Sequence, residues 1–201
     1  MLDGWARRRI DPALDAVAAR LAGAGVTPNA ITLAGFALGI VAAGAIAAGA
    51  LWTGLALILA SRLCDGLDGA VAKRTGATDL GGYLDIVLDF VFYGAIPLGF
   101  ALLDPAANGL AAAVLLFTFY ANGASFLAYA VMAGKRGMDG DARGPKSLFF
   151  TTGLAEATET LAVFVAFCLW PHWFAAIAYA FAAITAYTCV SRIVLAWRTF
   201  G

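Results

Sequence analysis

Six apolar segments, each long enough to cross a bilayer as a helix, constrain this chain more than any other feature. A transmembrane helix needs about 20 apolar residues, and such segments lie at 29–50, 53–73, 81–103, 107–133, 147–170 and 173–197. Hydrophobic residues make up 62% of the chain and charged residues 13%, whereas a soluble domain carries about 25% charged residues. Backbone polar groups in lipid must be satisfied within the segment itself. The sequence therefore predicts an all-α integral membrane protein, a six-transmembrane-helix bundle.

An amphipathic segment, 1–27, precedes the first span. Its apolar residues recur at helical spacing, with charged residues between them: Trp5, Ile10, Leu14, Val17 and Leu21. This pattern predicts a juxtamembrane helix lying on the membrane surface. The alternative is an amphipathic helix packed on the protein, and both descriptions can hold together.

Basic residues indicate the orientation. They lie before the first span, between spans two and three, between spans four and five and after span six, while the opposite loops carry no Lys or Arg. By the positive-inside rule, both termini are predicted to be cytoplasmic. The zero net charge gives no indication of a nucleic-acid partner, and the three cysteines fit neither a disulfide framework nor a zinc site.

One window breaks the apolar pattern. The stretch 64–90 reads CDGLDGAVAKRTGATDLGGYLDIVLDF and holds five of the 13 acidic residues, while 31–61 and 91–103 carry no charge. Spans two and three are joined by a short connection near Gly76, so they must run antiparallel. Within the spans the acidic residues form two pairs on helix faces, three and four residues apart: Asp65 with Asp68, and Asp85 with Asp89.

The two pairs are predicted to meet at one depth. Asp68 lies eight residues before Gly76 and Asp85 nine after it, so both should sit roughly 12 Å inside the helix ends. Four unpaired carboxylates there would be very costly, and the nearby bases, among them Arg62, are too few to neutralise them. Clustered carboxylate oxygens suit hard divalent cations such as Mg²⁺, Mn²⁺ or Ca²⁺. The window therefore predicts a metal site near the cytoplasmic surface, whereas Asp79 in the connection is predicted to be solvated.

The window also resembles a known signature. Asp65-x-x-Asp68-Gly69-x-x-Ala72-Lys73 followed by Gly81-x-x-x-Asp85-x-x-x-Asp89 is similar to that of the CDP-alcohol phosphatidyltransferases. The resemblance implies a single domain over 1–201, in a multi-pass homodimer of the bacterial inner membrane. Two departures stand out: Lys73, followed by Arg74, replaces the usual arginine, and the gap before Gly81 is one residue short.

The resemblance implies a reaction and a set of site residues. The phosphatidyl group of CDP-diacylglycerol would pass to an alcohol with release of CMP. Asp65, Asp68, Asp85 and Asp89 would bind two divalent ions, Mg²⁺ or Mn²⁺, and Asp89 would act as the base. The residues expected at the CDP-lipid are Asn29, Thr32, Gly69, Lys73, Arg74 and Thr78.

The acceptor is less constrained. The connection between spans four and five is basic and contains Lys135, Arg136, Arg143 and Lys146. These residues would suit a phosphorylated acceptor such as glycerol 3-phosphate or inositol phosphate. The positive-inside bias of membrane proteins alone also explains their presence. Glu156 and Glu159 share a face of span five near the depth of the aspartates. They are predicted to line the acceptor pocket, and the alternative is pairing with Arg62 or Arg192.

Two other functions fit an acidic membrane site. A divalent-cation transporter would need polar residues continuing towards the outer side, and spans two and three offer few. A catalytically inactive scaffold would not need all four acidic positions intact. The transferase is therefore the favoured function.

Overall fold

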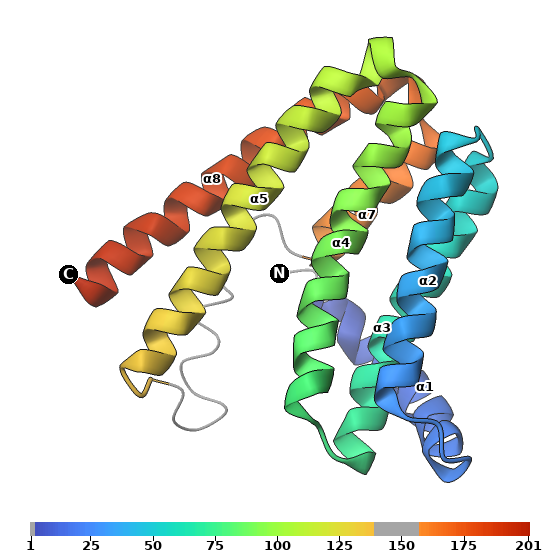
Figure 1. Cartoon of the computed structure of the whole chain (residues 1–201), viewed down its shortest axis with the longest axis vertical. Helices are drawn as coiled ribbons and strands as arrows, with labels where there is room; N and C mark the ends of the chain where they lie inside the picture. The colour runs from blue at the N-terminus through green and yellow to red at the C-terminus, as the bar shows by residue number, and fades with distance from the viewer. Residues whose placement is uncertain (1–2, 139–156) are drawn as a thin grey trace.

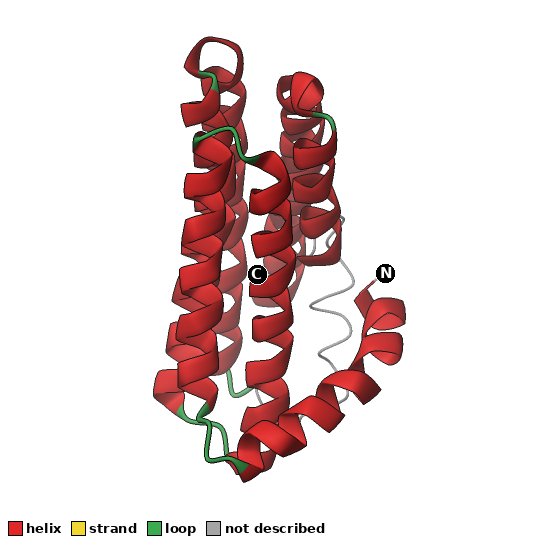
Figure 2. Cartoon of the chain, turned by 90° about the vertical axis from the view of Figure 1, so that its right-hand side faces the viewer, coloured by secondary structure: helices red, strands yellow, loops and turns green. Residues whose placement is uncertain are grey.

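The chain folds as a set of helices joined by short loops. The computed structural model describes residues 3–138 and 157–201, and this part contains no strand (Figure 2). The helices are α1 (Asp3–Gly23), α2 (Pro28–Ala47), α3 (Leu51–Thr75), α4 (Asp79–Leu103), α5 (Pro105–Lys135), α7 (Ala157–Leu169) and α8 (Phe174–Phe200), with a short 3₁₀ turn at Pro171–Trp173 before α8.

Local sequence signals set the helix ends. Thr27 caps α2 by accepting a hydrogen bond from the backbone N–H of Ala30 at 3.3 Å, and Asp104 caps α5 through the N–H of Ala107 at 3.0 Å. Proline follows each of these caps, at the first helical position, where its missing N–H costs nothing. Gly76 ends α3 with a φ of 102°, a conformation that favours glycine and permits the tight reversal into α4.

The helices overlap all six predicted spans, and the predicted all-helical membrane architecture is confirmed. Within residues 3–138 and 157–201, four helices are long and apolar enough to cross a bilayer: α2, α4, α5 and the stretch 171–200 that contains α8. Helix α3 has 25 residues but carries five charged side chains, all from Arg62 onwards. The described part of the fifth predicted span is the 13-residue α7, and 147–156 lies outside the described residues. The six-span count therefore stays a prediction.

The helices form two groups that meet at one end. Helices α2, α3 and α4 pack together, and α5 lies along α8. In Figure 1 the α5–α8 pair tilts away from α4 towards its lower end, while the α4–α5 and α7–α8 connections lie close together at the top. The start of α2, the α3–α4 connection and the end of α5 all lie at the lower end.

The main apolar core fills only the upper half of this arrangement. It is built on aromatic contacts between helices, including Phe100 stacked on Phe174 at 4.8 Å and Phe92 edge-on to Phe164 at 6.1 Å. Its α3 and α4 members, such as Ile58 and Ile96, come from the halves nearest the upper loops. The carboxylates of α3 and α4 therefore lie on the lower side of this core.

Helix α1 packs across the lower part of α3 (Figures 1 and 2). Ala18 is fully buried against α3, in a small cluster with Ala70 and Val71. Gly66 allows the close approach, since a Cβ there would lie 2.9 Å from the Leu14 side chain. Packing on the protein is thus observed, and contact of α1 with the membrane surface stays a prediction.

Candidate metal centre

Three of the four predicted aspartates converge. Asp65 of α3 and Asp85 and Asp89 of α4 each offer one carboxylate oxygen, and these oxygens lie within 4.8 Å of one another. The short turn around Gly76 makes α3 and α4 antiparallel neighbours, so residues at similar distances from the turn meet. Asp85 is exposed while Asp65 and Asp89 are partly buried, so the cluster opens to its surroundings on one side.

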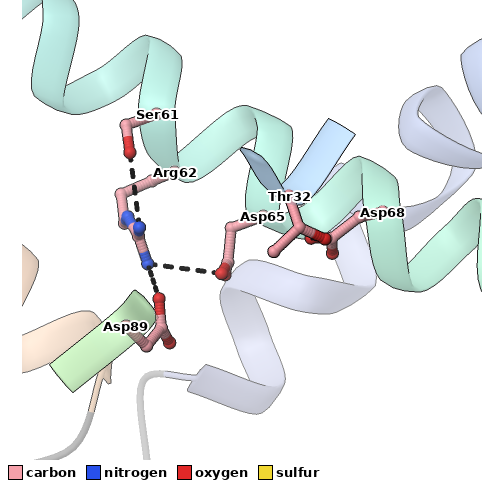
Figure 3. A network of polar contacts seen from close by, with 6 residues as sticks. All are labelled: Thr32, Ser61, Arg62, Asp65, Asp68 and Asp89. Carbon is pink, nitrogen blue, oxygen red and sulfur yellow. Dashed lines mark hydrogen bonds and ion pairs between the residues drawn. The ribbon is translucent and has the colours of Figure 1, made fainter. Parts of the chain in front are cut away.

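Asp68 belongs to the same cavity but is held differently. Its carboxylate accepts a 2.5 Å hydrogen bond from the hydroxyl of Thr32 on α2, and the residue is only 6% exposed (Figure 3). The Thr32 hydroxyl also lies 3.1 Å from the carbonyl oxygen of Pro28. The fourth aspartate is therefore oriented by α2, and α2 becomes part of the site.

A cation from the protein lies at the carboxylates. The guanidinium of Arg62 on α3 donates a 2.7 Å hydrogen bond to Asp89 and lies 3.3 Å from Asp65 (Figure 3). Its second terminal nitrogen lies 3.3 Å from the hydroxyl of Ser61. From the sequence, Arg62 is expected as a nearby base or as a partner of the glutamates, and its contact with both Asp65 and Asp89 is a finding of the structure. The available signal was its position one helical turn before Asp65, which places both side chains on one face of α3.

Glycines bring the walls of the cavity close together. A Cβ at Gly35 on α2 would lie 2.7 Å from Cβ of Cys64, and one at Gly39 would lie 2.5 Å from the ring of Phe92. Small residues allow such helix approaches in membranes. The cavity is lined by Thr32, Gly35, Phe36, Ser61, Arg62, Asp65, Asp68, Asp85, Leu88 and Asp89.

Several predicted CDP-lipid residues gather where α2 and α4 begin. Thr78 caps α4 by accepting a 3.0 Å hydrogen bond from the N–H of Gly81. A Cβ at Gly81 would lie 2.9 Å from the side-chain oxygen of Asn29, so the amide of Asn29 packs against this turn. Asn29 and Thr78 therefore lie together where α4 begins, and Thr32, three residues after Asn29, lines the cavity of the aspartates.

The remaining predicted CDP-lipid residues lie on the last turns of α3. Gly69 is exposed, with open space where a side chain would stand. Lys73 and Arg74 are also exposed, and Arg74 donates a 3.3 Å hydrogen bond to the carbonyl of Asp15 on α1. Arg74 thus links α3 to α1 through a hydrogen bond. Lys73 occupies the position at which the signature has arginine.

The predicted acceptor residues are more scattered. Arg136 donates hydrogen bonds to the carbonyls of Thr199 and Phe200 at the end of α8, at 3.0 and 2.7 Å. Lys135 ends α5. On α7, one carboxylate oxygen of Glu159 is buried and has no hydrogen-bond partner among the described residues. Three further residues lie outside the described part of the chain: Arg143, Lys146 and Glu156.

Arg192, considered as an alternative partner for the glutamates, lies between α8 and α5. It donates a 2.9 Å hydrogen bond to the side-chain oxygen of Asn122 and stands 5.3 Å from the ring centre of Phe126. Arg62, the other alternative, contacts Asp89 and Asp65. Pairing of either arginine with Glu156, which lies outside the described residues, stays a prediction.

The cluster has the chemistry of a divalent-cation site. Carboxylate oxygens are the ligands that Mg²⁺ and Mn²⁺ prefer. Three such oxygens already converge, and among the described residues the positive group that reaches them is the Arg62 guanidinium, which contacts two of the carboxylates. The residues present therefore fit a divalent cation.

Comparison with known proteins places this site in a family. The sequence profile of the CDP-alcohol phosphatidyltransferases matches residues 25–191. The inner membrane protein YnjF of Escherichia coli is 45% identical over 96% of this chain and 94% of its own length. Archaetidylinositol phosphate synthase of Methanothermobacter thermautotrophicus is 30% identical over 96% of this chain and 90% of its own length.

The fold agrees with a solved structure. Phosphatidylinositol phosphate synthase of Mycobacterium tuberculosis, in complex with manganese and citrate, superposes with a TM-score of 0.71 at 24% identity over 92% of this chain and 88% of that one. From its sequence, fold and acidic cluster, the chain belongs to the CDP-alcohol phosphatidyltransferase family and is a multi-pass membrane transferase.

Proposed function

We propose that this protein transfers the phosphatidyl group of CDP-diacylglycerol to a small polar alcohol and releases CMP. The observation that carries the proposal is the convergence of Asp65, Asp85 and Asp89 within 4.8 Å at the edge of an apolar bundle. A cavity of this kind can hold charged headgroups while the acyl chains stay in lipid. A crystal structure of the mycobacterial synthase, with a TM-score of 0.64 to this chain, holds CDP-DAG.

The proposed reaction is a displacement at the phosphorus atom that carries diacylglycerol. The acceptor hydroxyl attacks the phosphorus that carries diacylglycerol, the bond from that phosphorus to the bridging oxygen breaks, and CMP leaves. Asp89 takes the hydroxyl proton. One of its oxygens is bonded to Arg62, which leaves the other oxygen to accept the proton.

The four aspartates would hold two divalent ions, Mg²⁺ or Mn²⁺. When bound, the ions would neutralise the pyrophosphate and stabilise the charge of the displacement. Asp65, Asp85 and Asp89 already converge, while Asp68 is oriented by Thr32.

The CDP part would occupy the entrance between α2, α3 and α4. Thr32 lines the cavity of the aspartates, and Asn29 and Thr78 lie together where α4 begins, so these three residues would contact the nucleotide. Gly69 leaves open space beside it, and Lys73 would meet a phosphate as a point charge in place of an arginine. Arg74 would reach the nucleotide only after leaving the carbonyl of Asp15.

The acceptor would be a phosphorylated polyol, with inositol phosphate and glycerol 3-phosphate the first to test. Support comes from a relative named archaetidylinositol phosphate synthase and from the basic residues after α5. The acceptor pocket would include Glu159 and Lys135, with the further predicted residues Arg136, Arg143, Lys146 and Glu156.

The proposed topology has six spans with both termini in the cytoplasm of a bacterial inner membrane. It is supported by the basic residues, which collect before α2, in the last turn of α3 and around the end of α5. A homodimer is the proposed assembly, on the family resemblance alone. Reporter fusions to the C-terminus test the topology, and the mass of the protein in nanodiscs tests the assembly.

The reaction is tested with purified protein in liposomes, CDP-diacylglycerol, Mg²⁺ or Mn²⁺ and a panel of alcohols. We expect metal-dependent release of CMP with at least one phosphorylated polyol, and lipid analysis names the product. Asp89→Asn is the negative control. No CMP release with any acceptor, from protein that is folded by circular dichroism, would refute the proposed reaction.

A further inference from the structure

Arg62 is the one charged side chain of the cavity whose role the signature leaves unassigned. One terminal nitrogen of its guanidinium contacts both Asp89, at 2.7 Å, and Asp65, at 3.3 Å. These two aspartates come from different helices, α4 and α3. Arg62 therefore joins the two halves of the acidic cluster (Figure 3).

The surroundings of Arg62 hold it in place. Its side chain is only 13% exposed, and the centre of its guanidinium lies 3.9 Å from the ring centre of Phe92. Tyr93 adds a second aromatic ring at 5.7 Å. A cation over aromatic faces is stabilised by the ring electrons, more strongly when water is excluded. Besides the aspartates, the guanidinium has the Ser61 hydroxyl at 3.3 Å, and Phe92 beneath it belongs to the apolar core that fills the upper half of the bundle.

The charges do not balance without a further cation. With the four aspartates ionised, Arg62 offsets one of four negative charges, and three remain. Repulsion between these carboxylates opposes their close approach, and the guanidinium relieves it where Asp65 meets Asp89. A divalent cation would relieve it further, but it would also be repelled by the fixed positive charge of Arg62.

We infer that Arg62 is a positioning residue with two linked effects: it holds Asp65 and Asp89 together when metal is absent, and it lowers the affinity of the site for divalent metal. This inference rests on the proposed metal centre. It follows from two observations. The Arg62 guanidinium contacts the carboxylates of both Asp65 and Asp89, and the ring of Phe92 packs against that guanidinium.

Metal binding by the full-length protein tests this inference without any assay of activity. The protein is purified in detergent, freed of metal with a chelator and titrated with Mn²⁺, and free Mn²⁺ is read from its electron paramagnetic resonance signal. Thermal unfolding is followed with and without Mn²⁺. The variants are Arg62→Gln, Arg62→Lys and a matched control, Arg192→Gln, which removes an intramembrane arginine that contacts Asn122.

Arg62→Gln should unfold at a lower temperature than the wild type without metal, and it should bind Mn²⁺ on the order of tenfold more tightly, since a repulsive charge is gone. Its stabilisation by Mn²⁺ should therefore exceed that of the wild type. Arg62→Lys keeps the charge and should bind Mn²⁺ within about threefold of the wild type, as should Arg192→Gln.

Unchanged or weaker Mn²⁺ binding by folded Arg62→Gln would overturn the inference while leaving the metal centre intact. If Arg62→Gln folds only when Mn²⁺ is present and unfolds on chelation, the inference is supported. If Arg62→Gln does not fold at all, the Arg62→Lys variant decides. An affinity of Arg62→Lys for Mn²⁺ equal to that of the wild type supports the role of the positive charge, and clearly tighter Mn²⁺ binding overturns the inference. No Mn²⁺ binding by the wild type would refute the metal centre itself, and the role of Arg62 with it.

Discussion

The hydroxyl of Thr32 donates a 2.5 Å hydrogen bond to the carboxylate of Asp68, across the contact between α2 and α3. The two residues are 36 positions apart in the sequence, and Asp68 is only 6% exposed. A buried carboxylate without a donor is costly, so this bond orients the one aspartate that stands apart from the cluster of three.

Thr32→Val tests that bond, because valine keeps the shape of threonine and removes the hydroxyl. We expect a loss of about 1–3 kcal/mol in stability, since Asp68 stays buried and loses the hydroxyl donor from α2. The rate of CMP release should fall as well. Thr185→Val is the matched control, because the buried Thr185 hydroxyl bonds, within the described part of the chain, to the carbonyl of Phe181 in its own helix. Equal losses in both variants would contradict a special role for the Thr32–Asp68 bond.

Gly35→Ala tests the close approach of α2 and α3. The added Cβ would lie 2.7 Å from Cβ of Cys64 and 3.3 Å from the carbonyl of Ser61, so the helices must separate. We expect a loss of about 1–3 kcal/mol and a clear fall in CMP release, since the cavity lies between these helices. Gly44→Ala, also on α2, has open space around its Cβ and should be neutral or stabilising by up to about 1 kcal/mol. Thermal unfolding in detergent measures both variants, and similar behaviour would argue against the packing explanation.

Asp89→Asn tests the general base. A carboxamide cannot take a proton, so CMP release should fall by roughly 10²–10⁴-fold. Asp79→Asn is the control, since Asp79 is exposed in the first turn of α4 and should retain nearly full activity. Binding of CDP-diacylglycerol, measured separately, should survive in both variants. Comparable activity of Asp89→Asn and wild type would remove Asp89 from the mechanism.

Glu159→Gln tests the acceptor pocket. One oxygen of Glu159 is buried without a hydrogen-bond partner in the described part of the chain, which leaves it available to bind an acceptor hydroxyl. We expect a higher KM for the acceptor, or a changed order of preference among acceptors, with the KM for CDP-diacylglycerol unchanged. Kinetics over the acceptor panel measure the difference. Identical constants for every acceptor would exclude Glu159 from the pocket.

Much of the site could be predicted from the window 64–90. The turn at Gly76 forces α3 and α4 to run antiparallel, so Asp65, Asp85 and Asp89 had to lie at similar depths, and they do converge. The helices also lie close to their predicted ranges, because the length of each apolar run and its capping residues are local properties. The contacts of Arg62 could not be predicted in this way. Its charge is evident from the sequence, but the direction of its side chain depends on Phe92 and Tyr93 of another helix.

The sequence by itself determined that the protein lies in a lipid bilayer, that it is helical and that acidic residues pair on two adjacent helices. The length of the apolar segments, the capping residues and the short turns set these features, and each of them acts over a few residues. Only the tertiary structure decided that Thr32 orients Asp68, that Arg62 bridges Asp65 and Asp89, and that Arg136 binds the end of α8 instead of pointing freely into the connection. The Thr32–Asp68 and Arg62–Asp89 contacts join side chains of different helices, and Arg136 reaches backbone carbonyls of another helix. They depend on how closely glycines such as Gly35 let those helices approach and on which side of each helix faces its neighbour.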